Sequence, residues 1–273
     1  MKRLAVFLTV ALVLGAFCVS TAGAGKIEEI KERGALIAGV KDAVVPFGFV
    51  DKDTNKIVGF DVDMCRAVAA TLGVDLQIKP VTSDSRIPML AQGSVDMLAA
   101  TMTHKFSRDD IIDFSITYFM DGQKLLVPVD SGIESTDDLV GKKVGTAKGS
   151  TSEKNIAVAQ PKCTVVSYEG YPDAFSAMKQ GLVDAVTTDS TILLGLKNSD
   201  PNPQKWAIVG DYIAPEPYGL GVPENDSKFR DMVNRVLVDL WNSGEYHKIY
   251  NKWFGPDTKY YLPLTWEMET WPY

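Results

Sequence analysis

The stretch RIPMLAQGSVDMLAATMTHKFSRDDIIDFS, residues 86–115, decides the fold and the chemistry expected of this chain. A short helical segment leads into an apolar strand over residues 95–100, and Thr101, Thr103 and Arg108 follow that strand. No partnering nucleophile, acid–base pair or metal cluster stands near them in the sequence. Hydroxyls followed by an arginine are typical of a fixed receptor for a carboxylate, because a guanidinium meets two carboxylate oxygens at once. The stretch therefore indicates that a small anion is held rather than chemically converted.

The first 24 residues predict a secretory signal peptide. A positive start, Lys2-Arg3, precedes the almost wholly apolar residues 4–19, and Ala22-Gly23-Ala24 matches an A-x-A cleavage pattern. A membrane anchor fits less well, because the apolar core is short and small residues follow it at once. We therefore expect export of a soluble chain that begins at Gly25 and acts in the periplasm.

The expected mature chain is acidic. The sequence has 28 basic and 35 acidic residues, and removal of Lys2 and Arg3 leaves 26 basic residues, a net charge of −9. Nucleic acids and anionic membrane surfaces are therefore disfavoured as partners. A negatively charged ligand would have to be bound by a local positive site.

The cysteines and histidines offer little for chemistry. Cys65 and Cys163, about a hundred residues apart, are expected to be buried free thiols rather than a disulfide. A lipoprotein anchored at Cys18 is disfavoured because Phe17 stands where a small residue is needed. With two histidines in the whole chain, neither a transition-metal site nor a Ser–His–Asp arrangement is expected, and no cofactor is implied.

Strand-like and helix-like segments alternate along the chain, which predicts α/β layers with mostly parallel sheets. Stretches marked by Pro and Gly at 121–128 and 211–221 divide it into two lobes with two crossings. We expect lobe 1 to comprise residues 25–123 plus 214–273, and lobe 2 residues 124–213. Expected strands cover 36–40, 74–81, 95–100, 125–129, 144–146, 165–168 and 183–186; expected helices cover 60–72, 87–91, 135–139, 172–179, 191–196, 227–241 and 245–253, and Ser150 opens another.

Residues 36–255 resemble the type II periplasmic solute-binding proteins of the polar amino acid family. The segments that carry the resemblance are GVKDAVVPFGFVD, IVGFDVDM, SRIPMLAQGSVDMLAATMT, FSRDDIIDFS, DDLVGKKVGTAKGSTSE, VDAVTTDS, EPYGLGVP and IYNKWFG, and the glutamate/aspartate branch with its Trp- and Pro-rich tail is the most similar. The resemblance implies a two-lobed clamp that closes on a free amino acid without chemistry. It also implies a monomer that delivers its ligand to the permease subunits of an ABC importer.

The resemblance also implies which residues bind the α-carboxylate and α-ammonium groups of the ligand. Arg108 and Thr103 would bind the carboxylate, and Thr101 and Asp189 the ammonium; Thr101 and Thr103 are expected to face one way along an extended segment. A surface arginine and an Asp189 N-cap are the structural alternatives. Ser150 and Thr151 open a helix, where a capping box and an anion-binding helix start are both possible.

Specificity is expected to depend on Lys41, Ser83, Arg86 and Tyr171. In the acidic amino acid binders that the chain resembles, basic residues stand at the Lys41 and Arg86 positions, with a histidine or tyrosine at that of Tyr171. Two cations there favour glutamate or aspartate over glutamine. The alternatives are a solvated loop lysine and a helix-surface arginine near Asp84, so glutamine or another polar amino acid remains a second possibility.

Two other functions are possible on the same fold. A cyclohexadienyl dehydratase-like enzyme needs a carboxylic acid poised in the cleft, for which Glu169 is the candidate. A chemosensory binding module would use the same binding chemistry as a transporter component.

Overall fold

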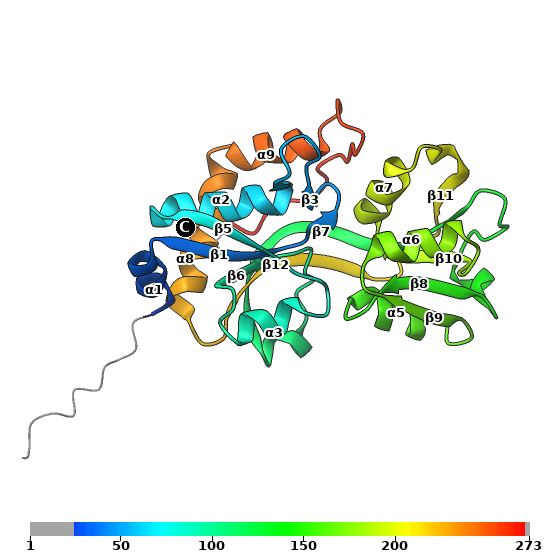
Figure 1. The fold of residues 1–273 in the computed structure, drawn as a ribbon, viewed down its shortest axis with the longest axis horizontal. Coiled ribbons are helices and arrows are strands. Elements are labelled where there is room, and N and C mark those ends of the chain that lie inside the picture. Colours follow the sequence, from blue (N-terminus) through cyan, green and yellow to red (C-terminus); the bar gives the residue numbers. More distant parts are fainter. Residues whose placement is uncertain (1–24, 271–273) are drawn as a thin grey trace, which may run out of the picture.

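The computed structural model describes residues 25–270, and the predicted signal peptide at 1–24 lies outside the described residues. The chain forms two α/β lobes that two long antiparallel strands connect, as Figure 1 shows. The predicted fold class is therefore confirmed. Within 25–270, none of the helices combines the length and the apolar character that crossing a membrane requires.

The sheet of lobe 1 has the strand order β5-β1-β6-β12-β7. Strand β1 lies parallel to both β5 and β6, whereas β12 runs antiparallel to β6 and to β7. Three short strands, β2, β3 and β4, form a separate antiparallel sheet. The bounds are β1 Ala35–Val40, β2 Ala43–Val44, β3 Gly48–Val50, β4 Ile57–Val58, β5 Asp75–Pro80, β6 Met97–Ala99, β7 Ile112–Pro128 and β12 Pro215–Pro223.

The sheet of lobe 2 continues from the end of β7 in the order β7-β10-β8-β9, with β11 on the other side of β7. Strands β10, β8 and β9 are parallel to one another, and β10 is antiparallel to β7. The bounds are β8 Lys143–Ala147, β9 Thr164–Tyr168, β10 Ala185–Asp189 and β11 Trp206–Val209.

Strand β7 belongs to both lobes. It pairs with β12 as far as Gly122 and with β10 and β11 from Gln123 onward. The sequence predicts a strand only from residue 125, because the marked stretch 121–128 indicates a division. Gly122 has another role: a Cβ there would lie 2.3 Å from Cδ1 of Tyr212, so the strand needs a residue without a side chain. The exact lobe boundaries stay a prediction.

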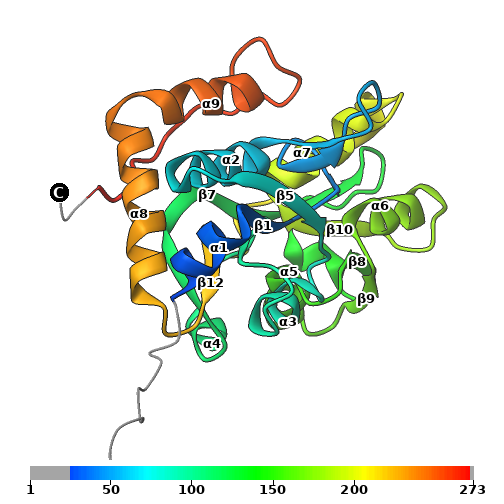
Figure 2. The ribbon, with the colours of Figure 1, turned by 60° about the vertical axis from the view of Figure 1, so that its left-hand side comes forward.

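Helices flank the sheets, and Figure 2 shows α8 and α9 at the edge of lobe 1, away from lobe 2. Helix α2 keeps its predicted bounds because apolar residues recur at helical spacing and Gly73, at φ 71°, ends it in the left-handed conformation. The predicted helix at 135–139 is a 3-10 turn over Thr136–Leu139. The bounds are α1 Lys26–Arg33, α2 Phe60–Leu72, α3 Arg86–Ala91, α4 Phe106–Asp109, α5 Thr151–Ala159, α6 Tyr171–Lys179, α7 Ser190–Ser199, α8 Ser227–Asn242 and α9 Glu245–Phe254.

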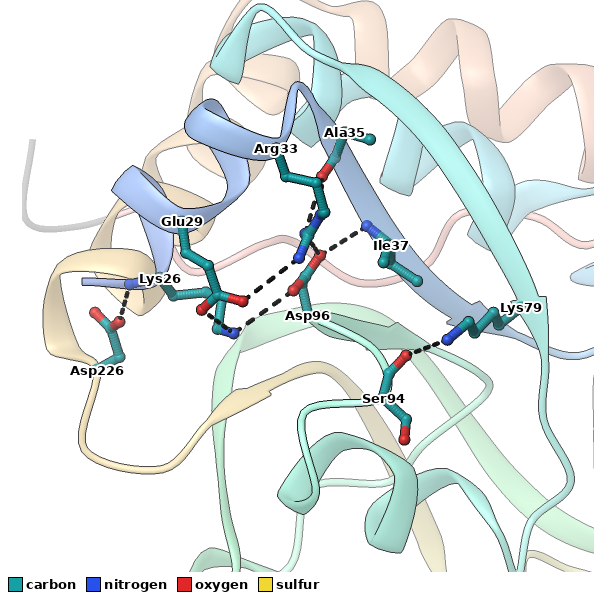
Figure 3. A network of polar contacts seen from close by, with 9 residues as sticks. All are labelled: Lys26, Glu29, Arg33, Ala35, Ile37, Lys79, Ser94, Asp96 and Asp226. Atoms are coloured by element: carbon teal, nitrogen blue, oxygen red, sulfur yellow. Dashed lines mark hydrogen bonds and ion pairs between the residues drawn. The ribbon is translucent and has the colours of Figure 1, made fainter. Parts of the chain in front are cut away.

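A buried carboxylate attaches α1 to the sheet (Figure 3). Asp96 accepts a hydrogen bond from the Ile37 backbone N–H at 2.8 Å and also pairs with Arg33. Lys26 lies 3.6 Å from the other oxygen of Asp96. Because Asp96 immediately precedes β6, the network joins the start of the described chain to the strand that leads to Thr101.

The core of lobe 1 is aromatic. Phe47, Phe60, Phe119, Tyr218 and Phe254 are fully buried and pack on one another with ring centroids 5.0–6.2 Å apart. Such pairs stabilise a core beyond their buried area. The two cysteines of the described part are free thiols; Cys65 is buried as predicted, but Cys163 is half-buried.

Candidate functional site

The candidate residues gather where strands end, at the junction of the two lobes. Lys41 directly follows β1, Thr101 comes two residues after β6, Ser150 follows β8, and Asp189 ends β10. The carboxyl ends of parallel strands in open α/β sheets are the usual location of ligand sites. The strand topology therefore brings residues far apart in sequence into one region.

Lys41 and Arg86 are both buried, which contradicts the surface alternatives for them. The Lys41 side chain is 6% exposed, and its Nζ donates to Ser83 Oγ at 2.7 Å. Arg86 is 2% exposed, and its Nη1 donates to the carbonyl oxygens of Ala100 and Thr101. One branch of this guanidinium therefore supports the main chain rather than pointing freely into the site.

Thr101 lies in a strained conformation, so the prediction of an extended segment is wrong. Its φ is 46°, in the left-handed region that residues with a Cβ rarely adopt. Asp61 accepts a hydrogen bond from the Thr101 N–H at 3.0 Å, while Arg86 binds its carbonyl oxygen at 3.0 Å. Two buried charged side chains thus stabilise a turn that local sequence preferences disfavour.

Arg108 belongs to the site rather than to the surface. It is 9% exposed, and its Nη1 donates to the Thr103 carbonyl oxygen at 2.6 Å. The neighbouring acid Asp109, with which a surface arginine could pair, contacts His104 instead, at 2.9 Å. Short helix α4 therefore carries Arg108 back toward the end of β6.

Lobe 2 contributes the start of α5. Ser150 is its N-cap and accepts from the Glu153 N–H at 3.2 Å, as the capping-box prediction requires. The reciprocal bond goes to the Gly149 N–H, at 3.0 Å from Glu153, rather than to that of Ser150. Thr151 begins the helix, and its Oγ1 lies 3.5 Å from that of Thr103 in lobe 1. The two predicted hydroxyl residues therefore meet across the lobes.

Asp189 stands at the N-cap position of α7 but makes no side-chain cap bond among residues 25–270. Asp121 of β7 provides that cap instead, accepting from the Thr191 N–H at 3.0 Å and from the Ser190 hydroxyl. One Asp189 oxygen accepts from the Tyr218 hydroxyl, and the other is buried with no partner in the described part of the chain. Asp189 is therefore the N-cap of α7 by position, but its side chain does not cap the helix.

The lobes touch each other through polar contacts on both sides of these residues. Lys148 Nζ lies 2.8 Å from Asp84 Oδ2, and Lys105 Nζ donates to Asn155 Oδ1 at 3.1 Å. Gly149, with φ at 73°, comes so near Asp84 that a Cβ there would lie 2.7 Å from its Cα. The arrangement is therefore closed.

Two buried acids were missed from the sequence. Glu216 of β12 is fully buried and accepts hydrogen bonds from Thr103 and from Thr151, the latter at 2.9 Å. Asp61 is fully buried and accepts from the Tyr118 hydroxyl at 2.7 Å. A signal for Asp61 existed: it precedes Cys65, Val68 and Leu72 at helical spacing, so it lies on the apolar face of α2.

Burial shifts the pKa values of these groups toward their neutral forms. It lowers the pKa of Lys41 well below its usual value, and the charge of Arg86 adds to this effect. Burial and Arg86 lower the pKa of Arg108 to about 9. Burial and the charge of Glu216 raise the pKa of Asp189 well above its usual value. Because the pKa of each of five side chains is shifted by the charge of another, the five share one electrostatic environment. They are Lys41, Arg86, Arg108, Asp189 and Glu216.

Of the remaining candidate residues, Tyr171 belongs to this cluster and Glu169 does not. Tyr171, the first residue of α6, is buried, and burial together with the charge of Asp189 raises its pKa. Glu169, the proposed acid of a dehydratase, is exposed. Within residues 25–270, no three His, Cys, Asp or Glu side chains gather as a metal site.

Similar proteins point to one family. The family described as "Bacterial extracellular solute-binding proteins, family 3" matches residues 36–256 of this chain. The glutamine-binding protein of Geobacillus stearothermophilus is 43% identical over 206 residues, 74% of this chain and 78% of that protein. The ABC transporter glutamine-binding protein of Bacillus subtilis is 38% identical over 232 residues, 84% of each chain. Relatives named as glutamate/aspartate-binding proteins are 28–30% identical.

Solved structures of amino acid-binding proteins share the fold of this chain. An ancestral arginine-binding protein bound to glutamine has a TM-score of 0.77 and 39% identity, covering 82% of this chain and 99% of its own. The predicted family is thereby confirmed, whereas the predicted glutamate/aspartate branch is less similar than the glutamine-binding relatives. The chain belongs to the bacterial extracellular solute-binding proteins of family 3, which bind solutes and are not enzymes.

Proposed function

We propose that this protein is the amino acid-binding component of an ABC importer and that its ligand is glutamine. The family and the names of the relatives from Geobacillus and Bacillus support both parts of the proposal. We further propose that it acts in the periplasm as a monomer, after removal of residues 1–24, and passes its ligand to permease subunits.

The balance of buried charge is the observation that carries the choice of glutamine. Lys41 and Arg86, beyond the Arg108 expected at the α-carboxylate, gave the sequence its apparent positive surplus, which favoured an acidic ligand. The structure adds Asp61 and Glu216 to Asp189, so three buried acids accompany three buried bases. A surplus that could stabilise a second ligand carboxylate is therefore absent from this set, and a zwitterion without net charge fits it best.

Each group of the ligand has a proposed partner. Arg108 would bind the α-carboxylate, while Asp189 and the Thr101 hydroxyl would accept from the α-ammonium group. The side-chain amide would lie against Lys41, Ser83 and Tyr171. The Lys41 ammonium group, which already donates to Ser83, can donate to the amide oxygen, and the Tyr171 hydroxyl can accept from the amide NH2 group.

Competing amino acids fit less well for electrostatic reasons. Glutamate would bring one extra negative charge into a buried set of balanced charges, and desolvation of a carboxylate without a counter-charge is costly. Arginine would place a cation near Lys41 and Arg86, where the charge of Arg86 already lowers the pKa of Lys41. The same site should therefore discriminate against both signs of net charge.

A thermal-shift screen of the twenty amino acids on residues 25–273, followed by calorimetry, tests the proposal. Glutamine should raise the melting temperature most, and glutamate should bind at least about tenfold more weakly. Arg108→Ala is the control and should respond to none of the twenty. Tighter binding of glutamate than of glutamine would overturn the ligand assignment, and no response to any amino acid would overturn the role itself.

A further inference from the structure

Glu216 occupies an unusual place for a buried charge. It lies on β12, opposite Asp121 of β7, where the two connecting strands pass between the lobes. Pro215 and Pro217 flank it, and a proline fixes its own φ and gives no N–H to the ladder. The carboxylate is therefore carried by a stiff segment of the connection rather than by either lobe's helices.

The carboxylate contacts both lobes at once. Its Oε2 accepts from the hydroxyl of Thr103 in lobe 1 and from that of Thr151 in lobe 2. Its Oε1 accepts from Asn155 Nδ2 on α5 at 3.0 Å, and Asn155 in turn accepts from Lys105 of lobe 1. Glu216 is thus the centre of a hydrogen-bonded chain that runs from one lobe to the other.

These contacts fix the direction of two hydroxyl groups. A threonine hydroxyl has one proton to donate, and both Thr103 and Thr151 donate theirs to Glu216. Their remaining lone pairs can only accept. The donor role that the sequence predicts for Thr103 toward a ligand carboxylate is therefore taken, and its hydroxyl is oriented to accept from an ammonium group.

We propose that Glu216 is a positioning residue of the ligand site, which orients the Thr103 and Thr151 hydroxyls and links the lobes through Asn155 when they close. The proposal rests on the proposed function, since it requires a ligand that closes the lobes. Bonds between Glu216 and α5 would form on closing and break on opening. Loss of these bonds should thus appear mainly as faster ligand release.

A double-mutant cycle on Glu216→Ala and Asn155→Ala tests this, with affinity measured by calorimetry and release by stopped flow. Asn155→Ala should bind glutamine about tenfold more weakly, because it loses one hydrogen bond to a charged group. Glu216→Ala should lose at least as much affinity, because the bonds from Thr103 and Thr151 are lost as well. The double variant should bind no more weakly than Glu216→Ala alone, since the two residues share one contact. Glu224→Ala, an exposed glutamate just past β12, is the matched control and should bind normally.

Other readouts separate this role from a purely structural one. Asn155→Ala should leave the melting temperature of the ligand-free protein unchanged while raising the rate of ligand release. This variant alone can test the proposal if Glu216→Ala does not fold. The proposal would be overturned if the fold losses in affinity of the two single variants multiplied in the double variant. An unchanged rate of ligand release in Asn155→Ala would also overturn it. In Asn155→Ala, glutamine, glutamate and arginine should lose affinity by the same factor, because the contact acts at the groups all amino acids share. Glu216→Ala also removes a buried negative charge, so glutamate should lose less affinity than glutamine in that variant, and arginine more. An error in the proposed ligand would therefore appear in the amino acid preference of the wild-type protein. An error in the proposed role of Glu216 would appear in the affinities and release rates of the variants.

Discussion

Substitution of Gly149 by alanine should weaken ligand binding by blocking the approach of the lobes. Gly149 precedes α5 in lobe 2, and Asp84 faces it from lobe 1. An alanine Cβ would lie 2.7 Å from Asp84 Cα and 3.0 Å from its backbone nitrogen. Carbon atoms in contact prefer about 3.5–4.0 Å, so the lobes would have to separate by roughly 0.8 Å at this point.

The substitution has two costs that different measurements separate. The left-handed φ of 73° disfavours alanine by about 1–2 kcal/mol in every arrangement of the lobes, which lowers stability. The clash with Asp84 exists only in the closed arrangement, which lowers affinity. If separation weakens two interlobe hydrogen bonds by about 1 kcal/mol each, binding should fall by about thirtyfold.

Gly132 is the matched control, because its φ is 71° and nothing lies within 4 Å of the position that an alanine methyl would take. Gly132→Ala and Gly149→Ala should lose similar stability in urea denaturation. Calorimetry with glutamine should show lower affinity for Gly149→Ala alone. Equal affinity of the two variants would refute the reasoning, because the ligand-bound lobes would then not approach each other at Asp84.

Three further predictions concern charge. Arg108→Ala should reduce binding of every amino acid by at least about a hundredfold, because a charge-assisted pair of hydrogen bonds is lost; calorimetry near wild-type affinity would contradict this. Asp96→Ala should lower the free energy of unfolding by about 2 kcal/mol in urea without changing ligand affinity, because the buried Ile37 N–H loses its partner. Burial raises the pKa of Asp61 to about 6, so the folded state holds a proton that the unfolded state releases near pH 4, and stability falls as pH rises from 4 to 6. Asp61→Asn should remove about 3 kcal/mol of this dependence; an unchanged slope in pH-dependent denaturation would show that Asp61 does not titrate there.

Periodic and local features were predictable from the sequence. Helix α2 has the predicted bounds because its apolar spacing and its terminal glycine are both local signals. The resemblance implied that Arg108 belongs to the site rather than to the surface, and its burial agrees with that expectation. Thr101 was misjudged, because its left-handed backbone depends on Asp61 and Arg86, which contact it from other segments.

The start of β7 and the capping of α7 were missed for a related reason. Asp121-Gly122 indicates a break when read alone, yet the strand continues because β12 pairs along it and Tyr212 packs on the glycine. Asp121 then caps α7, a helix that begins 69 residues later in sequence, by accepting from the Thr191 N–H. Local preference therefore yields to partners that only the folded topology supplies.

The proposed ligand differs from the one predicted because charge in a buried site is a sum over the whole fold. Lys41 and Arg86 are conspicuous in sequence, since both lie in segments already expected to form the site. Glu216 is inconspicuous: an acid between two prolines indicates a solvated loop, and its burial depends on contacts from both lobes. Counting cations alone predicts an acidic ligand, whereas counting all buried charges predicts a neutral one. Replacing Glu216 would thus disturb two properties together, the closure of the lobes and the neutrality of the site they enclose.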